Sequence, residues 1–170
     1  MNYSAGSLGS TPHLTAEMFR ARTGIDLVHI PYKGAGPALT ALIAGEVAVS
    51  FPGAGSAMPH LAAGRLRALG VTSAGPSALL PGVPTVASTV PGFETVALYG
   101  VFAPAGTPAE IVERLNREAV REISGSLLRE RFVASGLEPV ENTHRQFAAM
   151  VSADEAAMKK VISDIGLAKQ

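Results

Sequence analysis

The residues best placed to do chemistry are backbone amides and hydroxyls rather than charged side chains. Three segments rich in Gly, Ser and Pro, at residues 9–13, 31–37 and 52–56, each stand between an expected strand and an expected helix. A helix N-terminus presents unpaired N–H donors and the positive end of the helix dipole, so it attracts anions. Hydroxyl groups add donors of adjustable direction. This chemistry suits the capture of a carboxylate or phosphate.

The first segment supports two interpretations. Thr11 and Pro12 fit the N-cap and first position of a helix, so capping of its own helix would alone account for Thr11. The alternative is that Gly9, Ser10, Thr11 and His13 bind an anion at this helix start. Among the histidines, His13 has the most site-like position, because it directly follows the proline of the helix start.

The second segment also offers donors next to an expected helix. Tyr32 supplies a hydroxyl, and Gly34 and Gly36 allow the backbone to approach a ligand closely. Lys33 either pairs with an anion or only keeps the turn in water, because lysine is seldom buried without a partner.

Several catalytic chemistries lack their residues. The third segment is neither a G-x-S-x-G nucleophile elbow nor a Walker A loop, and a single G-x-G is weak evidence for a dinucleotide site. The chain has no cysteine, and its histidines lack metal-ligand spacing. No pair of carboxylates stands out for acid–base work. We therefore expect no metal, no cofactor and no enzymatic activity.

Length and charge narrow the class of protein further. The chain has 170 residues, which suggests one domain or two small ones. Its 14 basic and 14 acidic residues cancel, whereas a nucleic-acid-binding protein usually carries a basic excess. The longest uncharged stretch, residues 68–93, is interrupted by proline and glycine and cannot form one membrane-spanning helix. We expect a soluble α/β protein that does not bind nucleic acid.

The elements that would position the three segments alternate along the first part of the chain. Strands are expected at residues 2–5, 27–30, 47–51 and 66–72, with helices from Thr11 to Gly24, from Pro37 to Gly45 and from Ser56 to Gly64, and one helical turn at 85–89. This alternation indicates parallel βαβ units. In such sheets ligands bind at the carboxyl ends of the strands.

The second part of the chain is richer in charge and in helix signals. Residues 99–170 hold 9 basic and 10 acidic residues, against 5 and 4 in residues 1–98, so we place a boundary near residues 93–99. The expected elements are a strand at 96–103, a helix capped by Thr107 and Glu110, a helix at 126–135, a strand at 138–140 and a long helix that starts at a Thr143–Gln146 capping box.

Specific motifs resemble a known family. The segments are YSAGSLGSTPHL at residues 3–14, HIPYKG at 29–34, GRLRAL at 64–69, PGVPTV at 81–86 and FAPAGTP at 102–108. Together they resemble the Bug-type extracytoplasmic solute receptors of tripartite tricarboxylate transporters. The resemblance runs in order over essentially the whole chain.

This resemblance implies a periplasmic-binding-protein-like fold of the class II type, with a parallel or mixed sheet flanked by helices. In the family, two α/β domains close on a dicarboxylate, tricarboxylate or acidic amino acid and deliver it to membrane transporter subunits, so a periplasmic location is implied. The matching turns would bind the ligand. The predicted ligand-binding residues are Gly9, Ser10, Thr11, His13, Tyr32, Lys33, Gly34 and Gly36.

Family members carry further residues ahead of this point, including a signal peptide and a glycine-rich loop. We therefore expect residues 1–98 to form most of ligand-binding domain 2 and residues 99–170 the C-terminal part of domain 1, in a chain truncated at its N-terminus. The first ten residues have neither a basic nor an apolar signal-peptide region, so none is expected in the chain as given.

Two other interpretations compete with a solute receptor. A fragment without the rest of domain 1 would expose the apolar face formed by Ile111, Leu115, Phe147, Val151 and Ile162. Such a face favours a homodimer or a domain-swapped assembly with no ligand to bind. A nucleotide-binding enzyme or a regulator's sensor domain would need fingerprints or a DNA-binding head that this sequence lacks.

Overall fold

Three short parallel strands form the centre of the first part of the molecule. The structure is a computed structural model that describes residues 1–166. The central strand β1 (Asn2–Ala5) pairs on one side with β2 (Val28–Pro31) and on the other with β3 (Val49–Ser50). The expected strand at 2–5 is confirmed, and the other two are displaced or shortened. The order β2-β1-β3 means that the connection from β1 leads to one edge of the sheet and the connection from β2 crosses to the opposite edge.

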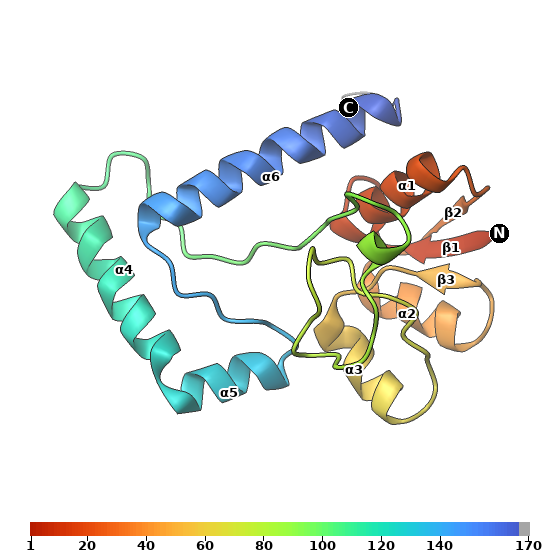
Figure 1. Cartoon of the computed structure of the whole chain (residues 1–170), viewed down its shortest axis with the longest axis horizontal. Coiled ribbons are helices and arrows are strands. Elements are labelled where there is room, and N and C mark those ends of the chain that lie inside the picture. The colour runs from red at the N-terminus through yellow and green to blue at the C-terminus, as the bar shows by residue number, and fades with distance from the viewer. Residues whose placement is uncertain (167–170) are drawn as a thin grey trace.

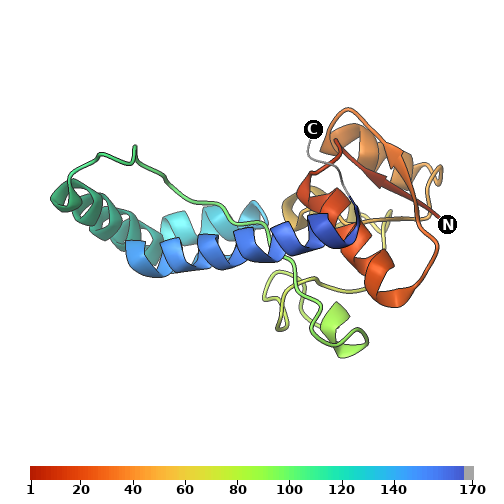
Figure 2. The ribbon, with the colours of Figure 1, turned by 90° about the horizontal axis from the view of Figure 1, so that it is seen from above.

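Six helices and one short turn account for most of the remaining described structure (Figure 1). They are α1 (Thr11–Thr23), α2 (Ala35–Ile43), α3 (Ala54–Ala62), the 3-10 turn η1 (Val86–Ser88), α4 (Ala109–Ser124), α5 (Ser126–Ala134) and α6 (His144–Asp164). The helices α1, α2 and α3 lie around the sheet, whereas α4 and α5 lie at the other end of the molecule. The long α6 runs between the two ends and contacts both α1 and α4 (Figure 2).

Helix ends were predicted better where glycine stops a helix than where a side chain begins one. Gly24 ends α1 in the left-handed conformation, with φ 69°, as its position predicts. The Thr143–Gln146 capping box of α6 is present with both of its hydrogen bonds. The predicted cap at Thr11 is wrong, because Ser10 is the N-cap and Thr11 is already helical.

Two further predicted caps are also wrong. The N-cap of α3 is Gly53, not Ser56. Ser56 is already the third residue of the helix, and its hydroxyl donates to the Gly53 carbonyl. In α4 the N-cap is Pro108, without a side-chain hydrogen bond, although Thr107 was expected there.

Three expected strands do not form within residues 1–166. Residues 66–72 contribute a single bridge between Val71 and Thr85, and residues 96–103 and 138–140 are irregular. A strand needs a neighbour for its ladder of hydrogen bonds, and no strand of the described part pairs with these segments. Val101 and Phe102 are consequently 84% and 70% exposed.

The core has two centres that meet at α1. Tyr3, fully buried, packs with Ala16 and Leu27 between the sheet and α1. On the other side of α1, Met18 packs with Phe93 and with Val161 of α6. Phe19 contacts both clusters, with its ring 6.0 Å from that of Phe93 and edge-on to it. The helix α1 is therefore held between the sheet and α6.

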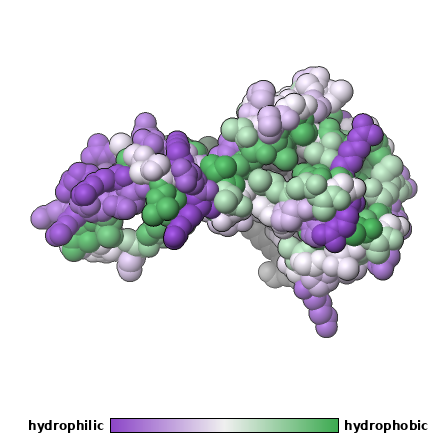
Figure 3. Space-filling model, turned by 90° about the horizontal axis from the view of Figure 1, so that it is seen from below, coloured by the Kyte–Doolittle hydropathy of each residue, from purple (hydrophilic) through white to green (hydrophobic). Residues whose placement is uncertain are grey.

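The end of the molecule formed by α4 and α5 has no buried side chain in either helix. Its exposed large apolar residues are Ile111, Leu115, Leu127 and Val133, and hydrophobic side chains lie open among charged ones at this end (Figure 3). Phe147 is half-buried and packs against Phe102, with ring centroids 5.5 Å apart. Within residues 1–166, no helix combines the length and the apolar character that crossing a membrane requires.

The open apolar surface leads to a prediction about assembly. We expect the 170-residue chain to self-associate as its concentration rises, because exposed apolar surface drives association. Val101→Asp should weaken association by roughly tenfold or more, since burial of such a side chain contributes about 1.5–3 kcal/mol. Size-exclusion chromatography with light scattering measures this. The matched change Ala74→Asp, in an exposed loop near the sheet, should leave association unchanged. A chain that stays monomeric at high concentration would contradict the prediction.

Candidate ligand-binding site

The carboxyl ends of the three strands bring three helix N-termini together. The loop at residues 6–10 follows β1 and leads into α1, residues 32–34 follow β2 and lead into α2, and residues 51–53 follow β3 and lead into α3. The middle position of β1 places the turn that follows it between the other two. Because the strands are parallel, all three turns lie at the same end of the strands (Figure 1). This is the place where open α/β sheets bind ligands.

A cavity of about 170 Å³ lies at this end of the strands, and residues of all three turns line it. The lining residues are small, apolar or hydroxylated: Ala5, Gly6, Ser7, Ser10, Pro12, Gly34, Ala35, Ala38, Leu39, Ser50, Pro52 and Gly53. None of them carries a charge. Binding of a charged group here would therefore depend on backbone amides and hydroxyls.

The helices that meet at the cavity lack the usual devices that satisfy a helix N-terminus. None of α1, α2 and α3 has a side-chain hydrogen bond from its N-cap or an acidic residue in its first turn. By contrast, α6 has a complete capping box and α4 has Glu110 in its first turn. The uncapped N–H donors and the positive ends of three helix dipoles thus remain available at the cavity.

Two lining residues have features suited to contact with a ligand. The Ser10 hydroxyl is buried, and no hydrogen-bond partner for it exists among the described residues. Gly34 has φ 105°, a conformation that favours glycine, and it lies where a Cβ on Gly6 would come within 3.5 Å. The first two turns thus approach each other closely, with a free hydroxyl beside them.

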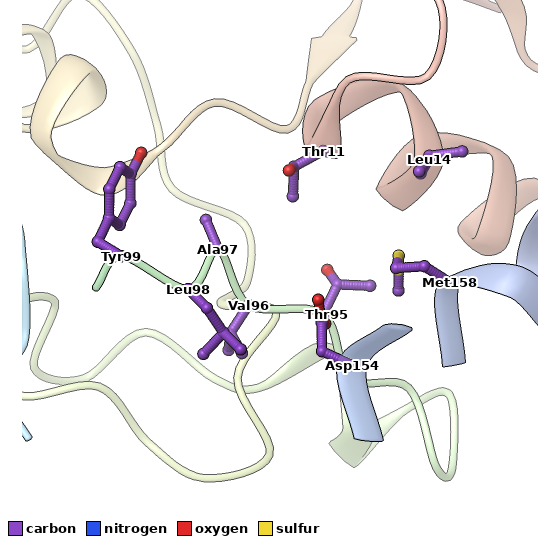
Figure 4. A pocket seen from close by; sticks show the side chains of 9 residues that line it. All are labelled: Thr11, Leu14, Thr95, Val96, Ala97, Leu98, Tyr99, Asp154 and Met158. Carbon is purple, nitrogen blue, oxygen red and sulfur yellow. The ribbon is translucent and has the colours of Figure 1, made fainter. Parts of the chain in front are cut away.

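A larger cavity, of about 310 Å³, lies on another side of the first turn of α1 (Figure 4). Its lining includes Thr11 and Leu14 of α1, Tyr99, and Asp154 and Met158 of α6. The only charged side chain among its lining residues is the carboxylate of Asp154, which would repel an anion. The smaller cavity is therefore the better candidate for an anionic ligand.

The comparisons with known proteins identify the family of the chain. Residues 1–167 match the model of the family described as Tripartite tricarboxylate transporter family receptor, TctC. The chain belongs to this family. The TctC match confirms the predicted resemblance to Bug-type receptors.

Relatives of this TctC chain are similar over almost all of its length. It is 34% identical over 169 residues to the UPF0065 protein in the tcbD-tcbE intergenic region of Pseudomonas sp. strain P51, covering 98% of the chain and 50% of that relative. It is 34% identical over 165 residues to Protein BugT of Bordetella pertussis, covering 96% of the chain and 51% of BugT. The chain thus spans about half the length of these curated relatives.

Solved structures confirm the periplasmic-binding-protein fold. The structure of R. palustris Rpa4515 with adipate has 35% sequence identity and a TM-score of 0.86, covering 98% of this chain and 56% of that one. The structure of the periplasmic binding protein BugD has 26% sequence identity to this chain and a TM-score of 0.83, and the match covers 100% of this chain and 58% of the BugD chain. The TctC chain therefore has the predicted α/β fold.

The structure brings only part of the predicted site of the TctC chain to the cavity. Ser10 and Gly34 line it directly. Gly9 lies in the same loop with φ 77°, and Gly36 lies in the first turn of α2, but neither lines the cavity. Thr11 lines the larger cavity instead.

The other three predicted residues have different surroundings. The Tyr32 hydroxyl lies 3.4 Å from Oε2 of Glu46 and donates to it. Lys33 is exposed and forms no ion pair within the part of the chain that the structure describes. His13 is only 3% exposed and accepts a hydrogen bond at Nδ1 from the Gly9 amide, so it lies beneath the loop.

Sequence reasoning missed residues contributed by the third turn. Ser50, Pro52 and Gly53 line the cavity, as do Ser7 and Ala35 from the other turns. The segment at residues 52–56 is one of the three turns expected to present donors to an anion, but the predicted ligand-binding residues include none of its members. The signal for these residues is the same strand-to-helix pattern that selects the first two segments, because a third βα turn of small residues lies at the same end of a parallel sheet.

A buried polar cluster lies under the first loop. The Tyr3 hydroxyl donates to Oε1 of Glu17 at 2.9 Å, and the Arg20 guanidinium pairs with Oε2 of Glu17 at 2.8 Å. The ring of His29 stacks on Tyr3 and lies 4.6 Å from that of His13. Burial lowers the pKa of both histidines, and in His13 the neighbouring His29 lowers the pKa further.

These pKa shifts predict how stability depends on pH. Unfolded histidine titrates near pH 6.5, and both folded-state pKa values lie lower, so below about pH 6.5 the unfolded chain binds more protons. The free energy of unfolding should therefore be highest above about pH 6.5 and fall as pH decreases through the folded-state pKa values. Each histidine contributes a slope of at most about 1.4 kcal/mol per pH unit.

Denaturant unfolding between pH 5.5 and 8 tests this expectation. His29→Phe keeps a ring against Tyr3 and removes one titrating group, so its profile should be flatter than that of the original chain. His144→Phe, at the start of α6 and away from the cluster, is the control and should keep the full dependence. Identical profiles for the original chain and His29→Phe would refute this assignment.

Proposed function

We propose that this chain forms the carboxylate-binding part of an extracytoplasmic solute receptor. The ligand is a dicarboxylate, a tricarboxylate or an acidic amino acid, bound in the periplasm for delivery to the membrane subunits of a tripartite tricarboxylate-type transporter. The observation that carries the proposal is the meeting of three uncapped helix N-termini at one uncharged cavity. The proposal is of a binding protein, not an enzyme, and requires no cofactor.

The binding energy comes from oriented amides and a hydroxyl. Each hydrogen bond to a charged group contributes roughly 1.5–3 kcal/mol. Three or four such bonds supply much of the roughly 8 kcal/mol that corresponds to micromolar affinity. The ligand would supply the partner that the Ser10 hydroxyl lacks within residues 1–166.

The ligand-binding residues have graded roles in this proposal. Ser10 and Gly34 contact the carboxylate directly, Gly34 through its backbone. Gly9, Thr11, Tyr32, Lys33 and Gly36 flank that contact on the loops and helix starts around the cavity. Their position supports this role, because they belong to the same two turns as residues that line the cavity.

The second jaw of the receptor would come from elsewhere. We propose that residues 1–98 form most of ligand-binding domain 2 and residues 99–170 the C-terminal part of domain 1. The absence of any buried side chain in α4 and α5 supports this division, because such helices need a further partner to bury their apolar residues. A solved relative with adipate makes adipate a suitable first probe.

A fixed anion inside the cavity should replace the ligand. Ala35 is the first residue of α2 and lines the cavity, so Ala35→Asp places a carboxylate at the proposed site. We expect the melting temperature of the ligand-free chain to rise by about 1–4 °C, because an acid at a helix N-terminus stabilises by about 0.3–1 kcal/mol. Adipate at about 100 times its dissociation constant should raise the melting temperature of the original chain by about 5–10 °C. It should have no effect on Ala35→Asp.

Ala109→Asp is the matched control for this experiment. It makes the same change at the first residue of α4, remote from the cavity, so it should keep the adipate response. If no member of a panel of carboxylates changes the melting temperature of the original chain, the alternative of a non-binding, self-associating fragment is favoured.

Ser10→Ala tests the hydroxyl itself. We expect adipate binding measured by calorimetry to weaken by about tenfold or more, with little loss of stability because the removed hydroxyl has no partner in the described structure. Ser4→Ala is the control: the Ser4 hydroxyl is equally buried and also lacks a partner there, but it does not line the cavity. Equal affinities for the two variants would exclude a direct contact from Ser10.

A further inference from the structure

We propose that His13 is a positioning residue that holds the ligand-binding loop at residues 6–10 through its neutral ring, so that protonation of His13 weakens anion binding. This inference rests on the proposed function and adds a regulation of the same site. It assigns His13 no contact with the ligand.

The geometry places His13 beneath the loop. It is the third residue of α1, and its Nδ1 atom lies 3.2 Å from the Gly9 amide nitrogen, which donates to it. Its ring lies 4.6 Å from that of His29 and 6.5 Å from that of Tyr3. With 3% of its surface exposed, His13 is buried, and it is not among the residues that line the cavity.

The bond from Gly9 requires an unprotonated Nδ1. Neutral imidazole has one acceptor nitrogen, whereas imidazolium has two donors and no acceptor. Protonation would therefore place an Nδ1–H donor of His13 opposite the N–H donor of Gly9 and break the hydrogen bond between them. The hydrogen bond also assigns the remaining proton to Nε2 in the neutral ring.

The groups that face His13 favour the neutral form. Tyr3 approaches from β1 and His29 from β2, and neither supplies a negative charge at neutral pH. Glu17, on α1, acts in the opposite direction and raises the pKa of His13, but less than burial and His29 lower it. Its carboxylate is already engaged by the Tyr3 hydroxyl and the Arg20 guanidinium. A proton on His13 would be buried beside His29 without a free counterion.

Loss of this bond would act on the loop residue that contacts the ligand. Gly9 has φ 77°, and the next residue, Ser10, donates its amide to the Ser7 carbonyl at 3.2 Å. Within residues 1–166, the His13 ring is the only side chain bonded to the loop at 6–10. Release of Gly9 would free the Ser10 hydroxyl and the Ser7 backbone from the geometry that lines the cavity.

The test combines adipate calorimetry with nuclear magnetic resonance of the ligand-free chain at pH 8, 7 and 6. Adipate stays ionised over this range, because carboxyl groups titrate near pH 4.3. His13→Asn keeps an acceptor close to the Nδ1 position and cannot be protonated. His13→Phe keeps the ring and removes the acceptor, and its fold is checked by circular dichroism. His144→Asn is the control.

We expect the affinity of the original chain and of His144→Asn for adipate to fall by up to about fourfold between pH 8 and pH 6, because the pKa of His13 lies below its ordinary value of 6.5 and at least about a quarter of the rings stay neutral at pH 6. His13→Asn should bind as tightly as the original chain at pH 8 and lose this dependence. His13→Phe should bind weakly throughout. The Gly9 amide resonance should titrate in the original chain and not in His13→Asn.

The outcomes separate this inference from the proposed function. A Gly9 resonance that does not titrate, or the same pH dependence of affinity in the original chain and in His13→Asn, would overturn the role of His13. If adipate and other carboxylates fail to bind while the Gly9 resonance titrates with His13, the positioning role stands and the proposed function fails. If His13→Phe does not fold, the comparison with His13→Asn still decides.

Discussion

The parallel pairing of β1 between β2 and β3 is the constraint on which the site depends. Each strand is followed by a turn and a helix, so the position of β1 decides which turns become neighbours. The connection from β1 goes to one edge and the connection from β2 crosses to the other, which leaves three helix starts at one end of the sheet. Neither helix propensity nor the composition of the turns would bring them together, since a strand separates each of α1, α2 and α3 from the next.

The electrostatics of the cavity follow from what the three helices lack. A helix start is normally satisfied by a capping side chain or by an acid in the first turn, and this chain does so at α6 and α4. At the cavity it leaves the donors without a capping side chain, which costs stability in the free protein and, in the proposed function, leaves them for the carboxylate. Charge can thus be recognised without a basic side chain in the lining, and the zero net charge of the chain is no obstacle to binding an anion.

The sequence allowed prediction of features that depend on local geometry. The strand at residues 2–5, the stop at Gly24 and the capping box at Thr143 each depend on a few neighbouring residues. The strand expected at 96–103 failed because a strand also needs a partner, which local sequence does not specify. For the candidate site, the family motif predicts Ser10 and Gly34, which line the smaller cavity. It could not show that His13, three residues from Ser10, points under the loop, because that depends on how α1 packs on β1 and β2.

The helix α1 connects the candidate site to the rest of the molecule. One of its faces packs on the sheet through Ala16, and another packs on Phe93 and on Val161 of α6. A buried hydrogen bond of 3.0 Å between the hydroxyls of Thr15 and Thr95 fixes it to the segment that leaves the first part of the chain. The first turn of α1 contributes to both cavities, Pro12 to the smaller and Thr11 to the larger. Because packed interiors resist deformation, a shift of α6 or of the segment near Thr95 would displace α1, and with it the loop that His13 supports.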